Sequence, residues 1–203
     1  MDQFEFANIL EKSSELDFEY QMANVMNDWR KYSGQLKELQ QIIGSVEDIN
    51  SPNEKGYTLI HVAAMRGLTH SLRELVEAGA DINAQHRETQ TRPLHMAMFE
   101  DRQASAIQLI NLGADLNAAD NEGHNALHIA ASYNLNAVAQ LIIEKGGDAT
   151  ALNSRGDTPS NLAVHPELRL SLDEALAAQQ REKLVGAVQE LEVTQVQAGR
   201  RRM

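Results

Sequence analysis

Two kinds of apolar segment alternate through the middle of the chain. The first kind is short and contains paired alanines, as at Ala63 and Ala64. The second is a stripe at helical spacing, as in Leu72, Leu75 and Val76. Since no run alternates between apolar and polar residues at a period of two, the pattern predicts pairs of helices and no sheet beyond turn hairpins.

Both kinds of segment recur about every 33 residues. Related blocks carry His61, His95 and His128, which stand 34 and 33 residues apart. A second block, residues 79–83 with the sequence Gly-Ala-Asp-Ile-Asn, returns at 113–117 and, degraded, at 146–150. Because one helix pair cannot bury both its faces, stacked units are expected to share a core. The extra residue of the longer spacing falls in 84–92, which is predicted to be a loop.

These blocks resemble the ankyrin repeat, whose pattern combines a turn glycine, Thr-Pro-Leu-His with alanines, and Gly-Ala-Asp followed by Asn. The resemblance implies an all-α fold, an α-solenoid of helix-turn-helix repeats with helical caps at both ends. The array is predicted to cover residues 18–163, with full units at 53–85, 87–118 and 120–152.

The resemblance weakens at both ends of the array. A divergent first repeat, 18–50, is indicated because Asp48-Ile49-Asn50 stands 33 residues before Asp81-Ile82-Asn83. A partial fifth unit, 153–170, keeps the turn motif, but Asn161 replaces the histidine and Pro166 is expected to shorten the helix;.

Two segments flank the array. Residues 1–17 are predicted to form an N-terminal capping segment, and Ser14-Glu15-Leu16-Asp17 is expected to cap the helix that follows. Residues 171–193 predict a C-terminal helix, and 194–203 a disordered tail. The sequence leaves open whether this helix caps its own array or pairs with another chain.

The composition of the chain excludes several classes of function. A formal net charge of −11 opposes attraction to nucleic acid or to an anionic membrane surface;. The chain contains no cysteine, which excludes disulfides, thiolate nucleophiles and cysteine-ligated metals;. No signal peptide or long apolar run is apparent, so a cytoplasmic protein is expected.

Candidate chemistry is sparse. His61, His95 and His128 occupy the same repeat position, roughly 10 Å apart by helix-packing distances, which is too far for one metal ion. We therefore expect each imidazole to bond the backbone of its own and the next turn. Hydrolase, nucleotide and cofactor fingerprints are absent, so no cofactor, metal, small-molecule substrate or enzymatic activity is predicted.

In ankyrin-like arrays the contact surface comprises the turn tips and the exposed residues of the first helices. At those positions the chain has an apolar line with a polar rim, and these are the candidate protein-binding residues: Tyr32, Tyr57, Met65, Arg66, Phe99, Glu100, His124 and Tyr133. Aromatic and Met side chains are favoured where binding energy concentrates. The alternative is that they pack on neighbouring side chains or on the chain's own tail.

The predicted function is a non-enzymatic, monomeric protein-protein interaction module, an adaptor or inhibitor that binds an unidentified protein through its concave groove. Two alternatives are an immunity protein for a co-encoded bacterial enzyme or toxin, and an effector delivered into a host cell. The sequence does not separate these three.

Overall fold

The computed structural model describes residues 3–26, 37, 39–45 and 48–200, and the part described contains helices but no strand. A long first helix, α1 (Gln3–Met26), precedes the array. Three helix pairs follow: α3 (Leu59–Arg66) with α4 (Thr69–Glu77), α5 (Pro93–Phe99) with α6 (Gln103–Asn111), and α7 (Ala126–Ser132) with α8 (Asn136–Glu144). A short α9 (Pro159–Leu162) and a long α10 (Pro166–Arg200) end the chain.

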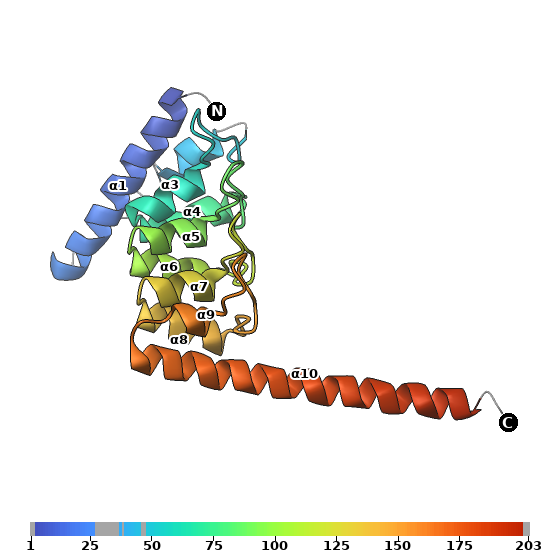
Figure 1. The fold of residues 1–203 in the computed structure, drawn as a ribbon. Coiled ribbons are helices and arrows are strands. Elements are labelled where there is room, and N and C mark those ends of the chain that lie inside the picture. Colours follow the sequence, from blue (N-terminus) through green and yellow to red (C-terminus); the bar gives the residue numbers. More distant parts are fainter. Residues whose placement is uncertain (1–2, 27–36, 38, 46–47, 201–203) are drawn as a thin grey trace.

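The helix pairs stack in chain order, as Figure 1 shows. The first helices pack in one row, α3 on α5, α5 on α7 and α7 on α9. The second helices pack in another, with α6 contacting α4 and α8, and α8 contacting α10. The predicted all-α solenoid is therefore confirmed. Among the described helices, none is both long enough and apolar enough to cross a membrane.

The core contains small residues in the first helices and branched residues in the second helices. The alanines at the first-helix positions, Ala63, Ala97 and Ala130, are all buried. Their small side chains let neighbouring helices approach closely, while Leu72 and Ile142 fill the space beside the second helices;. Since these residues belong to one continuous cluster, each unit depends on its neighbours for its core;.

A ladder of asparagines joins successive turns. The side-chain oxygens of Asn50, Asn83 and Asn117 each accept a hydrogen bond from the backbone N–H of the aspartate that begins the next unit's turn, over 2.7–2.8 Å. Each of these aspartates, in turn, accepts from the backbone two residues further on. The repeated Asp-x-Asn motif thus sets the spacing between units.

Two kinds of constraint explain the turn glycines. Gly79 and Gly113 have φ of 95° and 93°, the left-handed conformation in which a helix commonly ends at glycine;. Gly123 also has a positive φ, and a Cβ there would lie 2.9 Å from the backbone nitrogen of Ser154. The neighbouring turns approach closely because Ser154 N–H donates to Glu122 C=O.

The N-terminal region differs from the predicted boundary at residue 17. Helix α1 continues without a break to Met26, so residues 14–17 do not cap a following helix. Instead Asp17, which is buried, accepts hydrogen bonds from the His70 backbone N–H at 2.8 Å and the Ser71 hydroxyl at 2.9 Å. Because His70 lies in the first turn of α4, Asp17 satisfies a backbone donor that the helix itself leaves unpaired;. This cap joins α1 to the first full unit.

The C-terminal region also differs from its predicted bounds. Helix α10 begins at Pro166, five residues before 171, and runs to Arg200, through most of the segment expected to be disordered. After Pro166 the chain has no proline, and extending an existing helix costs little per residue. Pro166 shortens the fifth unit as predicted, since α9 ends at Leu162.

The first half of α10 caps the array. The Gln179 side chain donates to Gly147 C=O at 2.7 Å and accepts from Ala149 N–H at 2.9 Å. These backbone groups belong to the last turn, whose Asp148 N–H still donates to Asn117 of the preceding unit. Gln179 therefore adds hydrogen bonds from outside the repeat to a turn in which Thr150 stands in the place of Asn.

Candidate functional site

The three repeated histidines are structural. All are buried, and the Nδ1 atoms of His61, His95 and His128 accept from the backbone N–H three residues earlier at 3.3–3.4 Å. Two of them reach the next turn as well: Nε2 of His61 lies 3.3 Å from Thr91 O, and Nε2 of His128 lies 3.0 Å from Asp157 O. For these two the expected bonding to both turns is found, whereas for His95 only the bond within its own turn is found.

Burial keeps these imidazoles neutral. Desolvation lowers the pKa of His61 and of His95 to about 4, and it also lowers the pKa of His128;. Within the described part of the chain, no group of three histidine, aspartate or glutamate side chains is placed to hold a metal ion.

Five of the predicted contact residues lie together at the C-terminal ends of α3, α5 and α7. Met65 is half-buried and Arg66 is exposed at the end of α3. Phe99 and the exposed Glu100 follow one unit later, and Tyr133 directly follows α7. We call these five residues the helix-end row.

The aromatic pair is the most prominent part of the helix-end row. The rings of Phe99 and Tyr133 touch, with centroids 5.7 Å apart and planes tilted by 56°. Tyr133 is 51% exposed. Phe99 was predicted to be exposed, but it is half-buried and packs against the core because the neighbouring unit supports its ring. Phe99 therefore supports Tyr133, and Tyr133 offers the free surface.

Tyr57 lies apart from the helix-end row, at the other end of α3. It was also predicted to be exposed, but its ring stacks on that of His86 with centroids 4.5 Å apart, which leaves it half-buried. His86 belongs to the loop that holds the inserted residue, and its Nε2 bonds Lys55 O at 2.9 Å. His86 stands at the repeat position that Asn153 takes two units later, so the turn of the next unit covers Tyr57 as Asn153 contacts His124.

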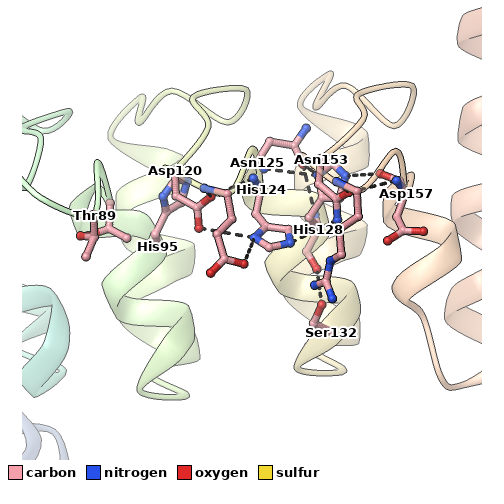
Figure 2. Close-up of polar contacts among 12 residues, drawn as sticks. Thr89, His95, Asp120, His124, Asn125, His128, Ser132, Asn153 and Asp157 are labelled. Carbon is pink, nitrogen blue, oxygen red and sulfur yellow. Dashed lines mark hydrogen bonds and ion pairs between the residues drawn. The ribbon is translucent and has the colours of Figure 1, made fainter.

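His124 is held within its turn rather than standing on a free rim. Figure 2 shows its imidazole beside Asp120, with Asn153 on the other side. Nδ1 lies 3.5 Å from an Asp120 carboxylate oxygen, and Nε2 accepts from the Asn153 amide at 3.2 Å. Because the Asn153 oxygen already accepts two backbone N–H groups, of Arg155 and Asp157, its NH₂ must face His124. His124, which was predicted to lie on the polar rim of the binding surface, therefore also has a structural role in its turn.

Sequence reasoning missed two parts of this surface. The Arg102 guanidinium donates to Met65 C=O at 3.2 Å and so lies between the first two units of the helix-end row. A hollow of 820 Å³ lies between α1, α3 and the turn at 53–55, and Phe6, Leu10 and Arg66 line it. Only the position of α1 creates this hollow, which no repeat pattern signals. The last candidate, Tyr32, lies outside the described residues.

The arrangement is suited to contact rather than to bond-making chemistry. It combines an exposed aromatic ring, a half-buried Met, and flanking charges of both signs, which is the usual composition of a protein interface. The three repeated imidazoles each accept a backbone N–H through Nδ1.

Comparison with known proteins agrees with the fold. Two family models match in overlapping stretches: "Ankyrin repeats (3 copies)" over residues 30–120 and "Ankyrin repeats (many copies)" over residues 109–163.

Relatives of several kinds share this region. The chain is 28% identical over 131 residues to the putative palmitoyltransferase ZDHHC13 of Danio rerio, covering 64% of this chain and 20% of that protein. It is 38% identical over 110 residues to ankyrin repeat and SOCS box protein 6 of Pongo abelii, covering 50% and 26%. It is 32% identical over 123 residues to NF-kappa-B inhibitor delta of Mus musculus, covering 58% and 37%.

The similarity is therefore confined to a part of each relative, since the chain spans between 20% and 37% of the length of these three proteins. What the three share with it is the repeat array. The repeated turns, the backbone-bonded histidines and the stacked helix pairs agree with both family matches, and the chain belongs to the ankyrin repeat family.

Proposed function

We propose that the chain is a non-enzymatic adaptor or inhibitor that binds one protein partner through the helix-end row. The observation that carries the proposal is the Phe99–Tyr133 pair, in which a half-buried ring supports one that is 51% exposed. A rigid, exposed aromatic side chain provides contact area at little cost in conformational entropy.

The surrounding charges support a protein partner. Arg66 and Arg102 flank Met65, while Glu100 flanks Phe99, so the row has both signs beside its apolar centre. The name of one relative, NF-kappa-B inhibitor delta, supports the inhibitor form of the proposal. The cytoplasm is the proposed location.

The test is Tyr133→Ala, compared with the wild type for partner retention in a pull-down from native cells and for thermal melting. Loss of an interface anchor typically costs about 2 kcal/mol of affinity, roughly thirtyfold, whereas truncating an exposed ring should barely change stability. Proteins lost with Tyr133→Ala and retained with the wild type are the expected partners.

Leu152→Ala is the matched control, because Leu152 is also exposed (61%) but belongs to the turn after the 146–150 block rather than to a helix end. If Tyr133→Ala retains every protein that the wild type retains, the helix-end row is not the binding surface.

A further inference from the structure

The side of α10 that faces away from the array has an apolar stripe. Leu170 is 60% exposed and Leu184 is 67% exposed, with Ala177 midway between them. Since these residues are seven apart, they lie on one line along the helix. Leu168 and Leu172, two residues to either side of Leu170, are buried against the array, about 200° around the helix from it;.

The array contacts of α10 lie on the opposite face from this stripe. Gln179 bonds the turn at 147–149, and the Lys183 ammonium contacts Thr150 and lies 3.7 Å from Asp148. Figure 1 shows the array on one side of α10 only. Up to Lys183 the stripe therefore lies opposite a face that the array occupies, and beyond it α10 continues past the array, with residues 184–190 exposed (Figure 1).

Two charges border the stripe in a self-complementary order. Glu174 and Arg181 are exposed, lie on the same side of the helix as the stripe, and are separated by seven residues, about 10 Å along the axis;. Midway between them are Ala177 and Ala178, which allow close approach of another helix. A two-fold axis between the two alanines would place Glu174 of one copy opposite Arg181 of the other, twice.

The same two-fold axis also brings apolar residues of the two copies together. Residues 170 and 171 of one helix then oppose residues 185 and 184 of the other, so Leu170 meets Leu184 and Val185 of the second copy. Such an interface is isologous, as closed two-fold dimers require. A parallel arrangement would instead place Arg181 against Arg181 and Glu174 against Glu174, which like-charge repulsion opposes.

We propose that this face of α10 binds a second copy of the chain, as an antiparallel helix pair centred on Ala177 and Ala178. The arrays project to opposite sides of the helix pair, because each lies on the far side of its own α10. The helix-end row belongs to other helices, so this inference is independent of the proposed function. It replaces the monomer expected from the sequence.

Charge reversal tests the register directly. Sedimentation of the full chain over a concentration series should give a mass that rises toward twice the 22.5 kDa of one chain. Glu174→Arg alone and Arg181→Glu alone should each remain at the mass of one chain, because each dimer would then contain two like-charged pairs.

Mixing the two variants provides the decisive measurement. A heterodimer of Glu174→Arg with Arg181→Glu restores opposite charges at both positions, so the equimolar mixture should recover the doubled mass, as should the chain with both changes. Glu88→Arg and Arg87→Glu, at an exposed turn, are controls of equal charge change and should dimerise like the wild type. Circular dichroism checks that each variant is folded.

Three results would overturn the proposal. The wild type could stay at one-chain mass throughout the series, the single variants could dimerise as the wild type does, or the mixture could stay monomeric. Leu170→Asp gives a test that does not depend on the charges, since it should also abolish the doubled mass.

Discussion

At the scale of single residues, one repeat position accepts a backbone hydrogen bond in four units. The imidazoles of His61, His95 and His128 accept the backbone N–H three residues earlier, and in the fifth unit the Asn161 side-chain oxygen accepts Thr158 N–H at 2.8 Å. The position therefore requires a buried acceptor more than it requires an imidazole. Any histidine placed there must stay neutral, which makes stability depend on pH.

The sign of that dependence follows from the lowered pKa. Between about pH 6.5 and pH 4 the unfolded chain takes up protons at His61 and His95 that the folded chain does not;. The free energy of unfolding should fall as the pH falls through this window, by roughly 2 kcal/mol for each of these two histidines at pH 5.

Replacing one histidine by the residue found in the fifth unit tests this directly. His61→Asn keeps an acceptor for Thr58 N–H and removes the titrating group, so the loss of stability from pH 7 to pH 5 should shrink by roughly 2 kcal/mol. Urea unfolding at the two pH values measures it. His165→Gln, at an exposed site, keeps His61, His95 and His128 and should keep the wild-type acid sensitivity. Equal slopes for all three proteins would contradict the assignment.

At the scale of helices, close approach of the first helices determines how the units stack. Helix α7 contacts α5, α8 and α9, and its Ala130 and Ala131 are buried among them. Interiors this dense tolerate little added volume. Their burial is what a close contact between neighbouring first helices requires.

Ala130→Leu should overpack this contact. The added carbons have no space between α7 and its neighbours, so the free energy of unfolding should fall by roughly 1 to 3 kcal/mol. Ala137→Leu is the matched control, because Ala137 lies exposed in the adjoining α8 and its substitution should change stability by no more than about 0.5 kcal/mol;. Thermal or urea unfolding of both variants measures the difference; a neutral Ala130→Leu would mean that this contact is not tight.

At the scale of the whole molecule, the two ends of the array are closed by single side chains from distant segments. Asp17 of α1 caps α4, and Gln179 of α10 bonds the last turn. A stack of repeats has open ends, where turn and helix groups have no next unit to bond. Both end helices supply those missing partners, and both are longer than a repeat helix.

Gln179→Ala should loosen the C-terminal end specifically. Two backbone groups, Gly147 C=O and Ala149 N–H, would lose their partners, at a cost of roughly 1 to 2 kcal/mol;. Hydrogen exchange should speed up first at Ala149 and in α9, before the units around α3 respond. Gln180→Ala is the control, since Gln180 is the exposed neighbour on the same helix; similar exchange in both variants would show that Gln179 does not close the array.

The sequence by itself determined the repeat and its phase. The Asp-x-Asn turns, the left-handed glycines, the paired alanines and the buried histidines all act within one unit or between adjacent units, so a period of 33 residues is enough to place them. The helix-end row follows from the same phase, because each unit repeats the same geometry.

Only the tertiary structure decided which side chains remain free and where the array ends. Tyr57 is covered by His86 from the next unit's turn, and Phe99 is supported by its neighbours, although both were predicted to be exposed. Asp17 meets its partners 53 and 54 residues away, and Gln179 does so 30 and 32 residues away, outside any repeat phase. A local pattern cannot specify such contacts, since they depend on how two helices from outside the repeat happen to cross the ends of the stack.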